Sequence, residues 1–442
     1  MGQLEANQNL ACIYFPILIL FIDPNRQLAG KQEISNLAVN FKSNNSMTET
    51  NGSTGNTRKD FETSGEIIQM AVNHTIVISG GGTGGHIYPG IAIANELKRK
   101  LPGAEIIFVG VKKRIEAKIV PSAGYRLKTI NVQYLSRKFG IQTFTFFFSL
   151  LLGFFQSLFL LLKFKPQVVI GTGGFVSGPV VYAACWLGIP TLIQEQNSYP
   201  GITTRLLAPK VKRIHLAFEE AKKYLGKVKD SDKFRVTGNP VRLEEKKVDR
   251  AAARSQFDLA PNKHTLLLFG GSQGASALNK ILLETLAQLS IDIQIIWQTG
   301  EPDFEKTRLA AKNYPHQIYL RPFIYNMAEA YAAADLALCR AGAITIAELI
   351  QKKVPAILVP YPHAAEAHQE KNARLLVEGK AADMILEQNL NSVFLKEKIE
   401  QLIFDENRLS EMRDNCKKFY FENAAEKIAE SAIELMNQPF KI

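Results

Sequence analysis

The alternation of strands and helices in this chain is clearest around Ser79-Gly80-Gly81-Gly82-Thr83-Gly84-Gly85-His86. The β-branched run at residues 75–78 precedes it and is typical of a buried parallel strand. Residues 87–101 follow, with apolar side chains at helical spacing. Glycines between a strand and a helix let the backbone approach a ligand, which the N–H groups of the helix start then face. The segment predicts the floor of a ligand site at the carboxyl end of a strand, with the imidazole of His86 directed at the ligand.

Three interpretations of this loop compete. A Walker phosphate loop ends in Gly-Lys-Ser/Thr, which residues 85–87 do not match. A dinucleotide fingerprint requires an acidic residue at the end of the second strand, but residues 105–109 are followed by Gly110-Val111-Lys112-Lys113. The third interpretation is a tight structural turn in which His86 only caps the helix locally. The loop therefore needs support from elsewhere in the chain.

Composition and charge narrow the class of protein. The 442 residues are 46% hydrophobic and 21% charged, which suits two globular domains. The net charge is +11, and residues 1–69 hold only five Lys/Arg against seven Asp/Glu, so the positive excess lies in the rest. We expect phosphorylated ligands and an anionic membrane surface as partners, and no nucleic acid, because no nucleic-acid-binding motif accompanies the charge. The four cysteines form no CxxC pair, which fits a reducing cytosol and argues against a zinc site.

Residues 1–69 differ from the rest of the chain. The apolar run at residues 10–22 lacks a preceding basic region and is too short for an ordinary transmembrane helix. Residues 43–65 are rich in Asn, Ser, Thr and Gly, a composition typical of disorder. We predict a poorly structured extension, with Met70 as the functional start or the extension as a dispensable tail. A short N-terminal anchor is the less favoured alternative.

Two successive strand–helix arrays follow, each opening on a glycine-rich turn. Such arrays predict an α/β protein with two Rossmann-like domains, whose parallel sheets face each other across a cleft. A Gly/Pro-containing segment at residues 235–240 is a plausible linker. Besides residues 75–78 and 105–109, we predict buried strands at residues 168–170, 190–197, 265–269, 293–297, 337–339 and 356–359.

Residues 144–162 contain no charge and are flanked by Arg137, Lys138, Lys163 and Lys165. Their length and composition qualify them as a transmembrane candidate. A single crossing would, however, put strands of one predicted sheet on opposite sides of the bilayer. The alternatives are a buried core helix or a helix that is partly buried and partly dipped into a membrane surface. We favour the second, because the flanking cations attract anionic lipids.

Four further segments converge on the chemistry of a sugar nucleotide. Residues 270–275 can present N–H groups and a hydroxyl to a diphosphate. Residues 340–348 begin a helix and place the carboxylate of Glu348 where it can accept ribose hydroxyls. Residues 368–373 and 194–197 carry side chains that could bond a sugar. Each segment alone is also compatible with an ordinary turn, a solvated helix charge or a capped loop, and it is their order and spacing together that indicate a function.

Together these segments closely resemble the MurG family, the UDP-N-acetylglucosamine:undecaprenyl-pyrophosphoryl-N-acetylmuramoyl-pentapeptide N-acetylglucosaminyltransferases. The resemblance implies a GT-B fold and extends from about residue 70 nearly to the C-terminus. It implies an acceptor and membrane-side domain at residues 70–238, a UDP-sugar domain at 239–423, and a C-terminal helix at 424–442 that returns toward the first domain. The motifs that carry it are GGGTGGHIYPG, QEQNSYPG, GNPVR, GGSQGA, FIYNM, CRAGAITIAE and HQEKNA.

The resemblance implies an inverting, single-displacement transfer of N-acetylglucosamine to the muramoyl 4-hydroxyl, with His86 as the general base. An imidazole with a pKa near 6.5 suits that task. Thr83, Gly84 and Gly85 would complete the first-domain loop. Asn197 would contact the donor sugar or the acceptor.

In the second domain the resemblance assigns groups to each part of the donor. Ile324 would offer backbone groups to uracil, Glu348 would bind the ribose, and Gln369 would bind the hydroxyls of N-acetylglucosamine. At Ala341 the family commonly has Ser, which could lower the affinity for the donor. The predicted phosphate-binding residues are Arg242, Ser272 and the start of a helix formed by Ala343, Ile344, Thr345, Ile346 and Ala347.

No metal or other cofactor is expected. Residues 230–232 match the letters of an Asp-x-Asp metal motif, but they lie in a lysine-rich segment and are interpreted as a solvated loop. The implied partners are UDP-N-acetylglucosamine, the undecaprenyl-linked muramoyl-pentapeptide, an anionic membrane surface, and other cell-wall synthesis and division proteins. The implied location is the cytoplasmic face of the inner membrane, as a peripheral protein. Alternatives are a related UDP-sugar enzyme with another acceptor, a UDP-sugar epimerase, and a non-catalytic UDP-sugar-binding scaffold.

Overall fold

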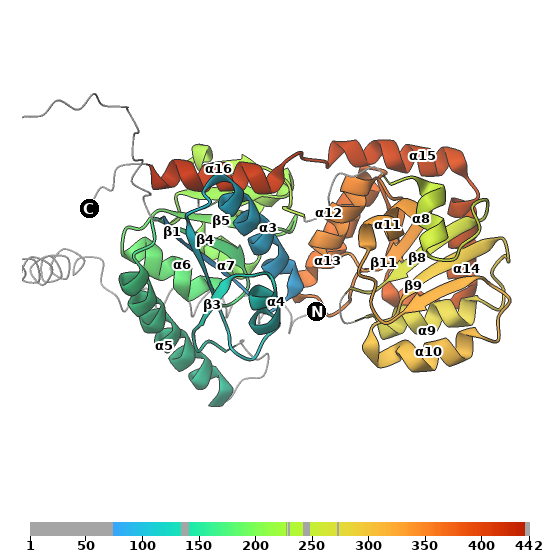
Figure 1. The fold of residues 1–442 in the computed structure, drawn as a ribbon, viewed down its shortest axis with the longest axis horizontal. Helices are drawn as coiled ribbons and strands as arrows, with labels where there is room; N and C mark the ends of the chain where they lie inside the picture. The colour runs from blue at the N-terminus through green and yellow to red at the C-terminus, as the bar shows by residue number, and fades with distance from the viewer. Residues whose placement is uncertain are drawn as a thin grey trace, which may run out of the picture. The chain divides into compact units, whose positions relative to one another are not determined.

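Two parallel β-sheets carry the fold, with helices on their faces (Figure 1). The structure is a computed structural model that describes residues 74–133, 141–226, 228, 230–241, 248–271 and 274–437. These residues all belong to one compact unit. The predicted α/β class with two parallel sheets is confirmed, while the prediction for residues 1–69 lies outside the described residues.

The first sheet has seven strands in the order β3-β2-β1-β4-β5-β6-β7, and every neighbouring pair is parallel. The strand order reverses between β1 and β4, which is where open α/β sheets bind ligands at their carboxyl edge. The strands are β1 (Thr75–Gly80), β2 (Glu105–Gly110), β3 (Arg126–Thr129), β4 (Val168–Gly173), β5 (Thr191–Glu195), β6 (Arg213–Leu216) and β7 (Phe234–Val236).

The second sheet has six parallel strands in the order β10-β9-β8-β11-β12-β13. Its order reverses between β8 and β11, so the same rule points to the turns that follow these two strands. The strands are β8 (His264–Phe269), β9 (Ile293–Gln298), β10 (Ile318–Arg321), β11 (Leu336–Cys339), β12 (Ala356–Leu358) and β13 (Asp383–Met384).

Helices follow most of the strands and cover both sheets. On the second sheet, neighbouring residues such as Leu267 and Leu268 enter two separate apolar clusters. They do so because successive side chains of a strand point to opposite faces. The helices are α3 (Gly84–Lys100), α4 (Glu116–Ser122), α5 (Ile141–Phe164), α6 (Ser177–Trp186), α7 (Ile202–Leu207), α8 (Arg250–Gln256), α9 (Ser276–Thr285), α10 (Phe304–Ala311), α11 (Met327–Ala333), α12 (Ala343–Lys352), α13 (His368–Glu378), α14 (Ser392–Ile403), α15 (Glu406–Asn415) and α16 (Ala424–Met436).

The last helix, α16, follows the second sheet in sequence but packs beside α3 (Figure 1). Ile428 and Ala432 enter the apolar cluster of the first sheet. The Nζ atom of Lys100 lies 2.9 Å from Glu426 Oε1 and 2.8 Å from Glu430 Oε1. The chain therefore reaches the first sheet again at its end. The domain boundaries at residues 238/239 and 423/424 stay predictions.

Helix α5 is the apolar segment singled out in the sequence, and it is buried on one face only. Leu161 and Ser157 are buried, whereas Phe148 is 71% exposed and Phe159 is 66% exposed. The helix packs against α6, where the ring of Phe154 lies 5.7 Å from that of Tyr182. Among the described residues, the span Thr145–Phe164 is long and apolar enough to cross a membrane, and 28% of it is buried. A fully buried core helix is therefore the wrong interpretation of this segment.

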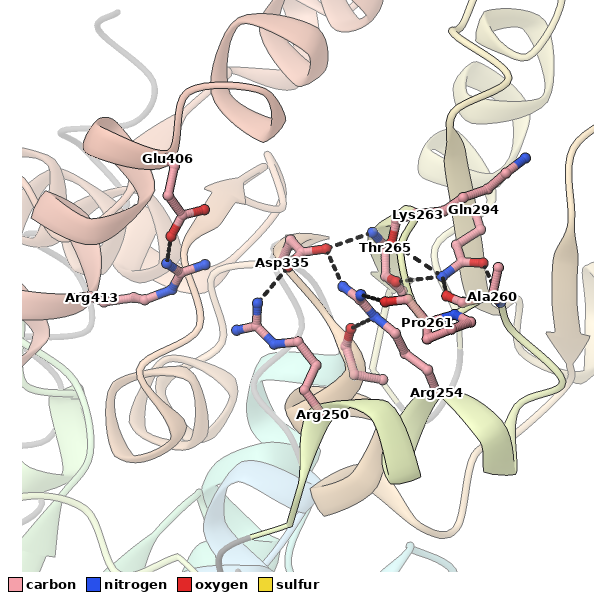
Figure 2. Close-up of polar contacts among 11 residues, drawn as sticks. Arg250, Arg254, Ala260, Pro261, Lys263, Thr265, Gln294, Asp335, Glu406 and Arg413 are labelled. Atoms are coloured by element: carbon pink, nitrogen blue, oxygen red, sulfur yellow. Dashed lines mark hydrogen bonds and ion pairs between the residues drawn. The ribbon is translucent and has the colours of Figure 1, made fainter.

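A polar network anchors α8 to the amino end of the second sheet (Figure 2). Asp335 is 4% exposed, and its Oδ2 accepts hydrogen bonds from Arg254 Nη2 at 2.6 Å and from the Thr265 N–H at 2.7 Å. Arg250 Nη1 bonds the other carboxylate oxygen at 2.8 Å. A buried charge requires such compensation. The network therefore has a structural role at the edge of the sheet opposite to the predicted site.

Candidate active site

The loop after β1 is held by a buried carboxylate. Glu116, the first residue of α4, is fully buried. Its Oε2 accepts a hydrogen bond from the Gly82 N–H and its Oε1 accepts one from the Val111 N–H, both at 3.1 Å. Thr83 is the N-cap of α3, so the helix begins at Gly84 rather than at residue 87 as predicted. An acidic residue thus does serve this loop, but it bonds the backbone instead of facing a ribose.

His86 projects from the first turn of α3 toward the end of β4. Its Nδ1 atom lies 3.2 Å from the Thr172 carbonyl oxygen and 3.0 Å from Gln196 Oε1. Both partners are acceptors, so Nδ1 carries the proton and the lone pair of the neutral ring lies on Nε2. The ring is therefore set up to accept a proton at Nε2.

Burial and neighbouring groups act against each other on the pKa of His86. Burial lowers this pKa below its usual 6.5, and the nearby His368 also lowers it. The carboxylate of Glu195 and the hydrogen bond to Gln196 act in the opposite direction, but burial is the largest effect. The imidazole is consequently neutral at pH 7, as a general base requires.

Close backbone approach explains the glycine at the end of β4. Gly173 has a φ of +101°, which favours glycine, and a Cβ atom there would lie 2.5 Å from His86 Nδ1. A side chain at this position would displace the imidazole. The glycine-rich end of β4 therefore makes room for His86.

The side chains after β5 bond to protein groups. Glu195 is 3% exposed, and its Oε1 accepts hydrogen bonds at 3.0 Å from both the backbone N–H and the side-chain amide of Asn197. Asn197 Oδ1 accepts from Asn372 Nδ2 at 3.1 Å. The Ser198 N–H and hydroxyl both donate to Asn372 Oδ1 at 2.9 Å. Asn197 thus lies where the ends of β5 and α13 meet.

The second sheet presents the start of α12 at the carboxyl end of β11. The N-cap of α12 is Gly342, which has no side chain that could cap the helix start. The first N–H groups of a helix lack intrahelical partners, and the helix dipole favours an anion there. The predicted phosphate-binding residues Ala343, Ile344, Thr345, Ile346 and Ala347 all lie in the first five positions of this helix.

Glu348 lies in the same helix and bonds a buried tyrosine. The Tyr331 hydroxyl donates to Glu348 Oε2 at 2.8 Å. Burial raises the pKa of Glu348 to about 7, and the Tyr331 hydrogen bond acts against this rise. The carboxyl group therefore titrates in the neutral range rather than in the acidic range usual for Glu.

Two further predicted donor contacts already have protein partners. The Ile324 N–H donates to Gln298 Oε1 at 2.9 Å. A uracil ring would have to compete with Gln298 for this N–H or use the carbonyl oxygen of Ile324. Gln369 Oε1 accepts from the Tyr361 N–H at 2.9 Å, which leaves the amide nitrogen of Gln369 facing away from that bond. Of the two polar atoms of the Gln369 side chain, only the amide nitrogen therefore remains for the predicted hydrogen bond to the sugar.

Predicted site residues from both sheets are connected through two asparagines. Asn239 Nδ2 donates to the Gln196 carbonyl at 3.0 Å and to the Ala343 carbonyl at 3.3 Å. Asn372 bonds Asn197 as described above. Arg242 and Ser272 lie outside the described residues, so the structure does not place them.

The chain matches the glycosyltransferase family 28 N-terminal domain over residues 76–216 and the corresponding C-terminal domain over residues 265–428. A relative from Thermoanaerobacter sp. (strain X514) is 42% identical over 356 residues, which cover 80% of this chain and 97% of the relative. That relative is named UDP-N-acetylglucosamine–N-acetylmuramyl-(pentapeptide) pyrophosphoryl-undecaprenol N-acetylglucosamine transferase.

The chain belongs to glycosyltransferase family 28. The predicted resemblance to MurG is also confirmed: the crystal structure of Acinetobacter baumannii MurG is 28% identical with a TM-score of 0.66, over 82% of this chain and 99% of that chain. The predicted GT-B fold is confirmed with it. The UDP-N-acetylglucosamine 2-epimerase from Neisseria meningitidis is 14% identical with a TM-score of 0.56, over 81% of this chain and 100% of that chain, and this likeness concerns the fold alone.

Several residues that organise this family 28 site were not predicted from the sequence. Glu116 follows β2 by six positions and has no motif around it. Asn239 and Asn372 stand inside quoted motifs, in which the sequence alone does not separate amides that bond the protein from amides that face a ligand. Tyr331 gives no local signal, because it belongs to the apolar side of α11.

The lining of a cavity of about 250 Å³ in the family 28 chain includes neither His86 nor Glu348. Gly238 and Phe421 line it, and these residues belong to the two segments that connect the sheets. Of the predicted site residues, its lining includes only Ala347. The site is therefore defined by its side chains and backbone groups rather than by this cavity.

Proposed function

We propose that this enzyme transfers N-acetylglucosamine from UDP-N-acetylglucosamine to the 4-hydroxyl of undecaprenyl-pyrophosphoryl-N-acetylmuramoyl-pentapeptide, forming lipid II. The observation that carries the proposal is the 42% identity to a transferase of that name over 97% of its length. The protonation state of His86 supports it, because the reaction needs a general base beside an acceptor hydroxyl.

His86 is the proposed base. The acceptor oxygen forms a bond to the anomeric carbon of the sugar while its proton passes to His86 Nε2. The bond between that carbon and the β-phosphate oxygen breaks, and UDP leaves with the electron pair. A single displacement of this kind inverts the anomeric centre. The loop at Thr83, Gly84 and Gly85 would hold the acceptor beside the base, and Asn197 would contact the sugar or the acceptor.

The start of α12 is the proposed diphosphate site, because its N–H groups and helix dipole would stabilise the negative charge of departing UDP. Glu348 would accept the ribose hydroxyls, and the amide nitrogen of Gln369 would donate to the sugar. Ile324 would bind uracil through its backbone. The remaining proposed phosphate ligands, Arg242 and Ser272, lie outside the described residues.

Helix α5 is the proposed membrane contact. Phe148, Phe155 and Phe159 are exposed along one face of the helix. At its C-terminal end, the guanidinium of Arg126 lies 5.2 Å and the Nζ atom of Lys128 lies 5.8 Å from the centre of the Phe164 ring. Apolar side chains beside cations fit the interface of an anionic membrane. The proposed location is peripheral, on the cytoplasmic face, where the lipid-linked acceptor would lie within reach.

A transmembrane role for α5 is disfavoured by the sheet. Strands β3 and β4 precede and follow the helix, and both belong to the seven-stranded sheet. Helix α5 also packs on α6, which follows β4. A spanning helix would have to leave this packing. We therefore propose that α5 lies in the membrane surface with its buried face still on the protein.

The test is transfer of labelled N-acetylglucosamine by the full chain from UDP-N-acetylglucosamine to a short-chain lipid-pyrophosphoryl-muramoyl-pentapeptide. We expect the disaccharide product, formed with inversion. Incubation of the donor without acceptor is the control, and epimerised sugar in that sample would favour the epimerase alternative. Normal binding of UDP with neither product would favour the non-catalytic scaffold and overturn the proposal.

A further inference from the structure

We propose that Gln196 is a positioning residue for the transfer reaction: it holds His86 in the Nδ1–H tautomer, and Gln194 and Asn239 hold Gln196 in turn. The inference rests on the proposed function, because it assigns a task to the partner of the proposed base. These three residues are only 1–8% exposed, so their amide groups depend on protein partners for hydrogen bonds.

The orientation of the Gln196 amide is determined by its surroundings. Its Nε2 atom lies 2.8 Å from the Thr172 carbonyl oxygen and 3.2 Å from the Gln194 carbonyl oxygen, and it also donates to Gln194 Oε1. Only a nitrogen can occupy this position, because an oxygen there would face three acceptors. The amide oxygen must therefore point at His86 Nδ1, from which it lies 3.0 Å.

The next two amides continue the same donor-to-acceptor order. Gln194 Nε2 donates to Asn239 Oδ1 at 2.9 Å, so Gln194 Oε1 is left to accept from Gln196. Asn239 Nδ2 donates to the Gln196 carbonyl and to the carbonyl of Ala343, the first residue of α12. Reversing any one amide would leave buried donors or acceptors unpaired, which destabilises the reversed arrangement. The chain of amides therefore favours one arrangement.

That arrangement determines which nitrogen of His86 can act as the base. A reversed Gln196 would present N–H groups to Nδ1, and the ring would then carry its proton on Nε2. Nε2 could then not accept the proton of the acceptor hydroxyl. The charged and titratable groups that face His86 are Glu195 at the end of β5 and His368 at the start of α13. Neither bonds the ring in the described structure, so the tautomer depends on Gln196 and the Thr172 carbonyl.

The direct test is the tautomer of His86 by ¹⁵N NMR of the histidine-labelled full chain. The wild-type ring should be protonated at Nδ1 at pH 8, and Gln196→Met should show a mixture with the Nε2–H form. The matched control is Gln294→Met. Gln294 is also a buried glutamine, and its Nε2 bonds Ala260, Lys263 and Thr265 in the anchor of the second sheet (Figure 2). The control should leave the His86 tautomer unchanged.

The second readout is the pH profile of kcat. Gln196→Met should lower kcat roughly tenfold, by analogy with the loss caused by removing the hydrogen-bond partner of a metal-bound histidine. Its acid limb should move to lower pH, because the imidazolium loses an acceptor. The KM for UDP-N-acetylglucosamine should stay within about twofold of the wild type. If Gln196 had only a structural role, the substitution would lower the amount of active enzyme without shifting the acid limb of the pH profile.

A Gln196→Met protein that keeps the Nδ1–H tautomer alone and the wild-type pH profile would overturn the inference. If this variant does not fold, Asn239→Ala tests the same row of hydrogen-bonded amides from its other end. It should also show the Nε2–H form of His86, in a smaller share than expected for Gln196→Met. The NMR readout needs no turnover. A protein without transferase activity would therefore contradict the proposed function. The NMR result would still test independently whether Gln196 determines the tautomer of His86.

Discussion

Two half-buried titratable groups, His86 and Glu348, lie at the carboxyl ends of the first and second sheet, and desolvation shifts their pKa values in opposite directions. At the first sheet, burial lowers the pKa of His86; at the second sheet, burial raises the pKa of Glu348 to about 7. The physical cause is the same in both, since a low dielectric disfavours the charged form. The first sheet thereby carries an imidazole whose neutral form is favoured, and the second sheet carries a carboxyl group that titrates near neutrality.

The partners of the two groups differ as well. His86 bonds two acceptors, Thr172 and Gln196, so its remaining lone pair is available for a proton. Glu348 bonds a donor, the Tyr331 hydroxyl, through one of its oxygens. The comparison teaches that similar desolvation leaves different hydrogen-bonding atoms available on the two groups, because acceptors lie beside His86 and a donor lies beside Glu348.

The largest expected effect is that of His86→Ala. Loss of the base should lower turnover by about 10²–10⁴-fold, or about 3–5 kcal/mol in activation free energy. The affinity for UDP, measured by calorimetry, should stay within about twofold because the proposed donor-binding groups belong to the second sheet. The control is His264→Ala. His264 is the first residue of β8 and its ring packs on Phe404, so this substitution should leave turnover unchanged. A large loss of UDP affinity in His86→Ala would contradict the proposal that His86 acts on the acceptor while the second sheet binds the donor.

Glu348→Gln should act mainly on the donor. A hydrogen bond to a charged group contributes about 1.5–3 kcal/mol, so the affinity for UDP-N-acetylglucosamine should fall by roughly tenfold to 100-fold. Turnover at saturating donor should change far less. Titration calorimetry measures the affinity, and Glu284→Gln on the exposed side of α9 is the control. Equal losses in affinity and in saturated turnover would contradict a binding role.

His215 separates the effect of burial from that of position in the site. It lies inside β6, and burial together with Arg213 and Arg235 lowers its pKa to about 3. An unfolded chain binds a proton at His215 below pH 6.5 and the folded chain does not, so its contribution to stability is complete above pH 6.5 and is lost as pH falls. Between pH 7 and pH 5, the free energy of unfolding should fall by about 2 kcal/mol more in the wild type than in His215→Leu.

Urea unfolding at several pH values measures this difference. If the free energy of unfolding fell equally with pH in the wild type and in His215→Leu, His215 would be shown to be protonated in the folded chain. In that case burial alone would not be sufficient to account for the neutral state of His86 either.

The smallest expected effect is the pH dependence of donor binding. If the ionised form of Glu348 accepts the ribose hydroxyls, binding should tighten as pH rises through about 7 and should release protons. The gain between pH 6 and pH 8 is at most about tenfold, or about 1.4 kcal/mol. Calorimetry with UDP-N-acetylglucosamine suits this test, because its diphosphate does not titrate in that range. Glu348→Gln should bind with the same affinity at both pH values, and an equal slope in this variant would assign the effect to another group.

Much of the architecture could be predicted from local pattern. The runs at residues 75–78, 168–170 and 265–269 became β1, β4 and β8, because central parallel strands are buried on both faces and leave an uninterrupted apolar signal. The start of α3 was predicted three positions late, since glycines that look like loop residues adopt the first turn of the helix behind Thr83. Short edge strands such as β3 and β13 were missed, because they are only partly buried.

The sequence by itself determined the family, the order of strands and helices, and the residue types available at the carboxyl ends of the sheets. Only the tertiary structure decided what those residues are prepared to do. The imidazole of His86 meets an amide 110 positions away, and the hydroxyl of Tyr331 reaches Glu348 from a different helix. Propensity and apolar periodicity act over a few residues, whereas a pKa or a tautomer depends on burial and on neighbours that only the folded chain brings into contact.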